Sequence, residues 1–291
     1  MNKLIYTLPK LYKAIVVSRP SKICKSPYLA DIQIITHKKV GNVIFNIRSK
    51  IVMAHTPALG CAGLVVSGKI VYVTKKENTK TKSKYTIYQT EIKEQGKKMI
   101  IGVNPNICNT LFEHILLNNI LDTFTDYTIK REYTIGKSRI DFLLTNQHKS
   151  ILCEVKNVCL AYYDDIPIKE LNKRDYSTHD INSKIAIFPD CNRKIQKKPI
   201  SPRAIKHIDE LIEASKNGYK CYLAFIIQRH DCTYFSPSKL DQTYYKKLQY
   251  AYKNGFLDII PIQIKWIGSN AYISKILELD KDFTNIICSL S

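Results

Sequence analysis

The sequence predicts an α/β protein of two domains, a small β-barrel or sandwich followed by a domain in which strands and helices alternate. The chain has 291 residues, and a domain usually contains about 100–200. Short runs of β-branched and aromatic residues, separated by turn residues, fill the first third. In the remainder, helical and strand patterns alternate, which is typical of an α/β domain.

The positive charge of the chain is concentrated in the predicted first domain. The whole chain carries 45 Lys and Arg against 25 Asp and Glu, a net charge of +20. Residues 1–100 contain 19 of the basic and four of the acidic residues, and so account for +15. A Lys-rich composition from an AT-rich genome would affect the whole chain equally. The asymmetry therefore indicates a polyanion-binding domain, and nucleic acid is the commonest such partner.

The nine cysteines indicate a reducing compartment. Their number is odd and no two form a C-x-x-C pair, so neither a zinc pattern nor a disulfide framework is expected. No apolar stretch approaches 18 residues, and the N-terminus lacks a signal-peptide core. We therefore expect an intracellular, cytoplasmic protein with no membrane partner. The oligomeric state is left open, a homodimer included.

The elements of the first domain are predicted to be short strands. The β-branched and aromatic runs lie at residues 30–36, 43–47, 69–74 and 84–88. A polar, basic loop is expected over residues 75–84. About five strands with few helical stretches favour a small barrel or sandwich.

The second domain begins where the pattern changes, after about residue 96. Apolar residues at Ile107, Leu111 and Ile115 have helical spacing, which predicts a helix over 106–123. Ser201 and Pro202 supply the cap and first residue of a second helix that ends at Gly218. The other predicted elements are strands at 127–133, 139–144, 151–158, 222–228 and 256–266, and a helix at 240–253.

Two of these strands place acidic and basic residues together. If residues 146–149 form the loop of a hairpin, Thr145 lies opposite Ser150, and Asp141 falls opposite Glu154. Arg139 then falls opposite Lys156, and alternation places Glu154 and Lys156 on one face of the sheet. We therefore expect two carboxylates beside an ammonium group.

Such a constellation suits a divalent metal ion. Neighbouring carboxylates repel unless a cation or a shared proton lies between them, and oxygen ligands suit Mg²⁺ or Mn²⁺. Such a metal could hold a phosphodiester oxygen and a water molecule that attacks the phosphorus. Lys156 would then orient this water or stabilise charge on the phosphorus. Glu113, on the preceding helix, is the third candidate ligand, and His114 is its alternative. The same residues also match a charge cluster on a solvated sheet face, so this alternative stays open.

Basic residues elsewhere are candidates for phosphate contacts. Arg203 and His207 are four positions apart on one predicted helix face, with Lys206 beside them. Together with Arg139 they form the predicted nucleic-acid-binding set. A surface charge stripe would have the same pattern.

Several segments resemble the sugar fermentation stimulation protein (SfsA) family. Its motifs are S-R-x-D-F, E-V-K-x-V, F-P-D and R-G-x-K-H-L, and residues 138–142, 154–158, 188–190 and 203–208 match them in this order. A weaker match to the family's V-N-T…N-x-L segment lies at residues 103–111. The chain departs from the family at Ala204, which replaces a glycine, and at residues 55–60, where an Asn and a Thr are lost.

The resemblance implies a more specific fold and site. It implies an OB-fold-like barrel, which we place at residues 1–98, and a restriction-endonuclease-like domain with a mixed sheet at residues 99–291. This second domain would be of the PD-(D/E)XK nuclease type. The resemblance also implies DNA binding, and it maps the two metal-binding acids and the catalytic lysine onto Asp141, Glu154 and Lys156.

The sequence therefore favours a DNA-binding protein with a Mg²⁺- or Mn²⁺-dependent nuclease site. Two alternatives remain: a non-catalytic DNA-binding regulator, and an RNA-binding or RNA-processing protein. The triplet of Asp141, Glu154 and Lys156 favours the nuclease, because a binding module does not need it. Nothing in the sequence separates DNA from RNA.

Overall fold

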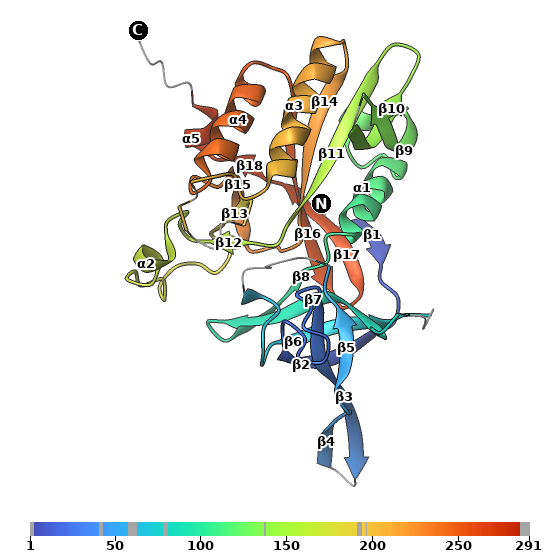
Figure 1. Ribbon diagram of the computed structural model, residues 1–291, viewed down its shortest axis with the longest axis vertical. Helices are drawn as coiled ribbons and strands as arrows, with labels where there is room; N and C mark the ends of the chain where they lie inside the picture. Colours follow the sequence, from blue (N-terminus) through green and yellow to red (C-terminus); the bar gives the residue numbers. More distant parts are fainter. Residues whose placement is uncertain are drawn as a thin grey trace.

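The structure of the protein is a computed structural model. It describes residues 3–40, 43–57, 63–77, 81–136, 138–190, 194–195 and 197–285. Two bodies are visible, a β-rich one in the lower half of Figure 1 and an α/β one above it. The described residues contain no helix that is long and apolar enough to cross a membrane. The described cysteines are free, whereas Cys61, Cys191 and Cys288 lie outside the described residues.

The N-terminal body is a small β-barrel, as predicted. Strand β2 pairs with β6, β6 with β7, β7 with β5, β5 with β3, and β3 returns to β2. Alternate residues of β2 are buried, so that Ala14 and Val16 join Ile32, Val71 and Ile87 in its core. The strands are β2 (Leu11–Ser18), β3 (Leu29–Val40), β4 (Val43–Arg48), β5 (Val52–His55), β6 (Ile70–Lys75), β7 (Tyr85–Glu94) and β8 (Lys97–Gly102).

The C-terminal body is built on a mixed seven-stranded sheet with the order β1-β17-β16-β14-β11-β10-β9. The central strands β11, β14 and β16 run parallel, and the flanking pairs are antiparallel. Strand β14 is almost entirely apolar because both of its faces are covered. The strands are β1 (Lys3–Thr7), β9 (Thr128–Ile135), β10 (Ser138–Thr145), β11 (Ser150–Val158), β14 (Lys220–Ile227), β16 (Asp258–Ile267) and β17 (Asn270–Ile276).

Helices cover the two faces of this sheet. The helix α1 (Ile107–Leu117) packs on one face. The helices α3 (Pro202–Lys216) and α4 (Gln242–Lys253) pack on the other (Figure 1). Ser201 caps α3 by accepting a hydrogen bond from the backbone N–H of Ala204, with Pro202 in the first turn as predicted.

Some elements differ from the prediction. The helix predicted over 106–123 ends at Leu117, since Asn119 adopts a left-handed backbone with φ of 47°, and a separate 3-10 turn η2 (Asp122–Phe124) follows. A four-stranded sheet is also present that the sequence patterns did not predict. Its strands are β12 (Ala161–Tyr162), β13 (Lys184–Phe188), β15 (Cys232–Pro237) and β18 (Glu278–Leu279). Two short helices, α2 (Ile168–Leu171) and α5 (Lys281–Thr284), flank it.

The strand pairing also corrects the predicted division at residue 98 in two places. Strand β1 pairs with β17, so the first residues of the chain belong to the C-terminal sheet and not to the barrel. At the other boundary, β8 continues through residue 98 to Gly102 while it pairs with β7 of the barrel. Backbone pairing sets these limits, and the composition change near residue 96 does not reveal them.

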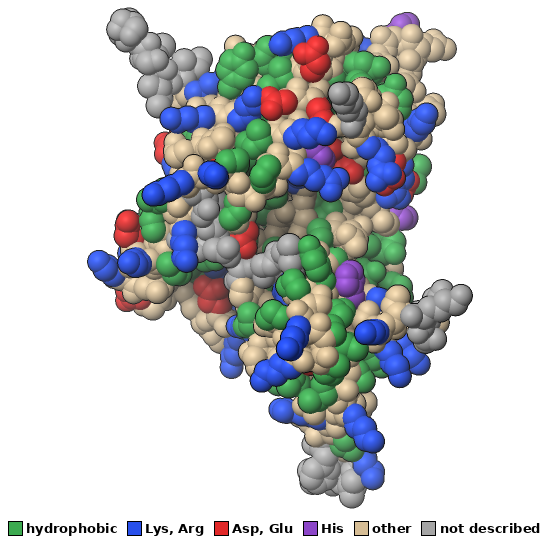
Figure 2. Space-filling view, viewed as in Figure 1, with side chains coloured by type: hydrophobic (Ala, Val, Ile, Leu, Met, Phe, Trp, Pro, Cys, Tyr) green, Lys and Arg blue, Asp and Glu red, His purple; other side chains and the backbone are tan. Residues whose placement is uncertain are grey.

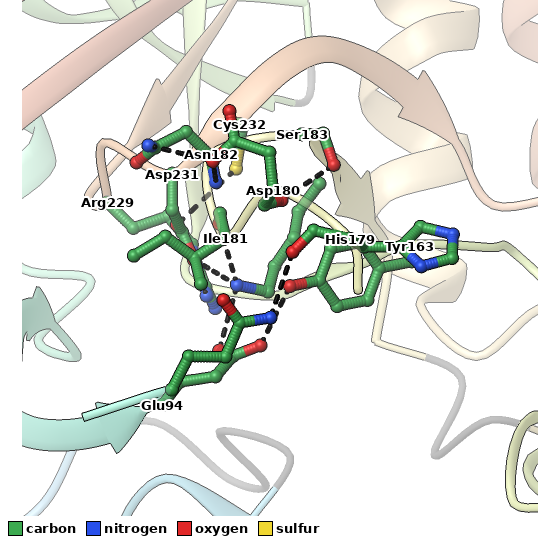
Figure 3. A network of polar contacts seen from close by, with 12 residues as sticks. Glu94, Tyr163, His179, Asp180, Ile181, Asn182, Ser183, Arg229, Asp231 and Cys232 are labelled. Atoms are coloured by element: carbon green, nitrogen blue, oxygen red, sulfur yellow. Dashed lines mark hydrogen bonds and ion pairs between the residues drawn. The ribbon is translucent and has the colours of Figure 1, made fainter. Parts of the chain in front are cut away.

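A buried polar cluster joins the two bodies (Figure 3). The Lys184 side chain, on a residue only 4% exposed, contacts Glu94 of β7 at 2.8 Å and Asp231 at 2.9 Å. Tyr163 donates a hydrogen bond of 2.9 Å to Glu94, and Arg229 donates two of 2.6 Å to Asp231. Burial alone would raise the pKa of Asp231, but the bonds and charge of Arg229 and the charge of Lys184 lower it to about 2.

Candidate functional site

The hairpin of β10 and β11 positions the candidate site. Phe142 pairs with Cys153 and Thr145 with Ser150, which is the predicted register. Residues 146–149 form the loop. There the Asn146 side chain accepts hydrogen bonds of 3.0 and 2.9 Å from the backbone N–H groups of His148 and Lys149. Alternation along β11 directs Val155 into the core beside α1, whereas Glu154 contacts α3 on the other face.

Asp141 lies where the two strands part. The ladder begins at Phe142 and Cys153, so the expected cross-strand pair of Asp141 and Glu154 does not form in this part of the described chain. Instead, Asp141 Oδ2 accepts a 2.8 Å hydrogen bond from the Val155 N–H, and Oδ1 accepts one of 2.7 Å from Asn109 of α1. Burial raises the pKa of Asp141 and the Glu154 charge adds to this, while the two hydrogen bonds only partly offset the rise.

Glu154 is held from the opposite side of the sheet and is only 2% exposed. Its Oε1 accepts a 2.5 Å hydrogen bond from Lys156 Nζ and also contacts His207 Nδ1. Burial alone would raise the pKa of Glu154, but the hydrogen bond to His207 and the charge of Lys156 outweigh it and lower that pKa. Its other oxygen, Oε2, is buried and has no hydrogen-bond partner among the described residues.

The helix α3 brings one of the three predicted basic residues directly to the site. His207 lies between Glu154 and Arg203, whose Nε donates to His207 Nε2 at 3.3 Å. An accepting Nε2 puts the ring proton on Nδ1, facing Glu154. Arg203 therefore reaches the site through His207. Lys206 does not, since its side chain is 61% exposed and pairs with Glu210 at 3.3 Å.

Two other predicted residues are engaged elsewhere. Glu113 forms a 3.0 Å ion pair with Arg131 of β9, and Arg139 forms one of 3.0 Å with Glu132 while its side chain stays 64% exposed. The structure therefore does not place Glu113 as a third ligand, nor Arg139 beside Lys156. The described residues contain no cluster of three His, Cys, Asp or Glu side chains arranged around a common point.

Sequence reasoning missed two residues that build the site. Asn109 lies one turn before Glu113 on α1 and is the helix residue that binds Asp141. The sequence does mark Asn109 as a candidate, because it is the first residue of the N-x-L match within residues 103–111. The second is Glu210, whose carboxylate contacts the Ser138 hydroxyl and so ties α3 to the start of β10. The S-R-x-D-F match includes Ser138, but no motif marked Glu210 as its partner.

The oxygens present here are of the kind that bind a hard divalent cation. Mg²⁺ usually keeps several waters and binds one or two protein carboxylates, so three acidic ligands are not required. Asp141 and the unpartnered Oε2 of Glu154 supply two such carboxylates. A buried carboxylate oxygen without a hydrogen bond is costly unless something compensates it, and a cation would do so.

Comparisons with known proteins agree on one family. Residues 106–269 match the family model described as the sugar fermentation stimulation protein RE domain. A sugar fermentation stimulation protein homologue from Pelagibacter ubique is 32% identical over 237 residues, which cover 80% of this chain and 88% of the relative. One from Trichodesmium erythraeum is 29% identical over 285 residues, covering 94% and 95%. The solved structure of Pyrococcus furiosus SfsA in complex with Ca²⁺ is similar in fold, with a TM-score of 0.71 and 20% identity over 96% of this chain and 99% of that one.

Proposed function

Because the chain belongs to the sugar fermentation stimulation protein family, we propose that it binds DNA and cleaves phosphodiester bonds at a metal-dependent site in its C-terminal domain. The observation that carries the proposal is the set of Asp141, Glu154 and Lys156 around the parting of β10 and β11. Glu154 is buried and Asp141 half-buried, each carboxylate lies within reach of the other's charge, and an ammonium group contacts Glu154.

The metal we propose is Mg²⁺ or Mn²⁺, held by Asp141 and by Glu154 Oε2. When bound, it would supply a Lewis acid for the phosphate and lower the pKa of a coordinated water. The P. furiosus relative was solved with Ca²⁺, a cation with similar oxygen ligands. Asn109 and the Val155 N–H fix the orientation of the Asp141 carboxylate.

The other residues act on charge and position. Lys156 Nζ, 2.5 Å from Glu154, supplies the positive charge that would stabilise the phosphorane-like transition state or orient the attacking water. His207 occupies Oε1 of Glu154 and so leaves Oε2 for the metal. Arg203 supports the imidazole from its other nitrogen and adds positive charge next to the site.

DNA binding rests on the charge of the chain. Residues 1–100 carry a net +15, and no acidic residue occurs between Asp31 and Glu77. A protein that neutralises phosphates releases the counterions condensed on DNA, which favours association at moderate salt. The barrel therefore supplies affinity, and the C-terminal domain supplies the chemistry.

A cleavage assay with matched variants tests this proposal. Purified protein is incubated with double- and single-stranded DNA and with RNA, in Mg²⁺, Mn²⁺ or a chelator, while binding is measured separately. We expect slow, metal-dependent cleavage that Asp141→Asn and Glu154→Gln abolish, because each removes a ligand charge while keeping the shape. Lys156→Ala should retain metal binding and lose about 100-fold or more in rate, because its charge acts in the transition state.

All three variants should bind DNA about as well as the wild type, because the barrel is unchanged. If neither metal supports cleavage of any substrate, and Glu154→Gln alters stability alone, the chain is a binding protein and the site is a structural charge cluster. Cleavage of RNA without cleavage of DNA would instead assign it to RNA processing.

A further inference from the structure

A two-stranded arm projects from the barrel, away from the C-terminal body (Figure 1). It comprises residues 35–40 of β3 and residues 43–48 of β4, which pair antiparallel from Ile35 and Arg48 to Val40 and Val43. Over this length β3 pairs with β4 alone, since its pairs with β2 and β5 lie at Leu29–Ile34. Six residues of strand extend about 20 Å.

Apart from the half-buried Ile35, the described side chains of the arm are exposed, and they carry positive charge on both faces. Cross-strand partners share a face, so Thr36, Lys38 and Ile47 lie on one side, and His37 lies with Arg48 on the other. Ile47 is 44% exposed although it is apolar. Within the described residues, neither Lys38 nor Arg48 forms an ion pair. Lys184 and Arg229 of the C-terminal body, by contrast, each form one with Asp231.

We propose that this arm inserts into the major groove of duplex DNA, an inference that rests on the proposed DNA-binding function. Paired strands lie about 4.8 Å apart, so a two-stranded ribbon with its side chains fits a groove about 12 Å wide. The major groove of A-form RNA is too deep and narrow for it. Lys38 lies on β3 and Arg48 on β4, so their long side chains would lie beside the phosphates on the two opposite walls of the groove.

Charge complementarity identifies DNA, a polyanion, as the partner of the arm. The arm belongs to a stretch from residue 32 to residue 76 that contains no Asp or Glu, and Figure 2 shows Lys and Arg side chains along the projecting end of the molecule. A second copy of the chain would bring the same charges together and would be repelled. A polyanion releases counterions and is attracted. A ribbon this isolated is marginally stable alone, and insertion into a groove would cover its apolar side chain.

The test compares the wild type and two doubly neutralised full-length proteins on one DNA duplex of about 30 base pairs and on an RNA duplex of the same length. The arm variant carries Lys38→Gln and Arg48→Gln. The control carries Lys253→Gln and Lys281→Gln, on α4 and α5 at the opposite end of the molecule, and has the same net charge. Affinity is measured by fluorescence anisotropy between about 50 and 300 mM salt, with circular dichroism to confirm that both proteins are folded.

We expect the arm variant to lose about tenfold or more in affinity near 0.1 M salt, and the slope of log K against log salt to fall by about 2, or 0.9 for each lost phosphate contact. The control should change by less than about twofold. Equal losses in both variants, or a loss of self-association with unchanged DNA affinity, would overturn the arm proposal while DNA binding by the protein stands. A wild-type protein that binds no duplex overturns DNA binding and the arm together, and tighter binding to RNA duplex overturns the choice of groove.

Discussion

At the scale of single residues, the two site carboxylates are held in opposite electrostatic conditions. Burial and the Glu154 charge raise the pKa of Asp141, so the fold disfavours its charged form. The hydrogen bond to His207 and the charge of Lys156 overcome burial and lower the pKa of Glu154, so the fold favours its charged form. Separated pKa values suit a pair of carboxylates at a metal site. Glu154 would stay charged in the metal-free protein, and a bound cation would compensate the charge of Asp141.

This difference predicts opposite effects of removing the two charges from the metal-free protein. Because the folded pKa of Asp141 is raised, the unfolded chain ionises first, so Asp141 begins to oppose folding as the pH rises through its ordinary value of 3.8 and opposes it fully above the folded pKa. Asp141→Asn should therefore raise the melting temperature at pH 7. It should have little effect below about pH 3.8, where the carboxyl is protonated in both states. Thermal unfolding in a chelator across this pH range measures it.

Glu154→Gln is the matched comparison and should have the opposite sign. Its charge offsets the Lys156 ammonium, whose side chain is 13% exposed, and the cost of about 3–5 kcal/mol for breaking a fully buried pair by removing one partner is the upper value here. If both variants destabilise the metal-free protein equally at neutral pH, the two carboxylates are not in different electrostatic conditions.

At the scale of elements, the docking of α3 against β10 controls where His207 lies. The Ser138 hydroxyl contacts Glu210, one turn beyond His207 on the same helix, and Glu210 Oε2 is buried without a hydrogen bond among the described residues. Ser138→Ala would remove the contact and leave the carboxylate with Lys206 at its edge. A hydrogen bond to a charged group contributes about 1.5–3 kcal/mol, and the partial exposure and Lys206 partner of Glu210 lower that value here.

We therefore expect Ser138→Ala to lower the free energy of unfolding in urea by about 1–3 kcal/mol. The same change in a Glu210→Ala background should cost less, because the partner is already absent. Strictly additive effects of the two changes would show that the contact does not hold the helix.

The elements that position the site were predictable where local chemistry determines them. The length of the loop at residues 146–149 gave the register of the hairpin, and Ser201 with Pro202 gave the start of α3. The point at which the strands part was not predictable, because it depends on a side-chain bond from Asp141 to the backbone and on a helix residue, Asn109, more than thirty positions away. The small sheet was missed since β12 and β18 contain two residues each and show no alternation.

At the scale of the whole molecule, the half-buried Glu94 of the barrel meets a cluster of the α/β body whose Lys184, Arg229 and Asp231 side chains are at most 5% exposed. The lowered pKa of Asp231 means that its contribution to stability is fully present above about pH 3.8 and is lost as the pH falls toward 2. A shift of this size corresponds to stabilisation on the order of 2 kcal/mol.

Asp231→Asn should therefore reduce stability at pH 7 and make unfolding less dependent on pH between about 4 and 2. Urea unfolding at several pH values, compared with Asp282→Asn on the exposed surface of α5, measures the difference. An unchanged acid limb in the Asp231 variant would mean that other carboxylates determine acid unfolding.

The strand β1 has a further consequence for how the molecule is assembled. The chain begins in the α/β sheet, where Leu8 donates its N–H to Ser269, leaves it to build the whole barrel, and returns at Gly102, which donates to Gln228. The barrel is thus an insertion within a single α/β domain and not a module attached to its end. Cutting the chain after residue 98 would strip an edge strand from β17 and leave that edge open to aggregation. Separating the parts requires excision of the barrel, with β1 rejoined to α1 through a linker.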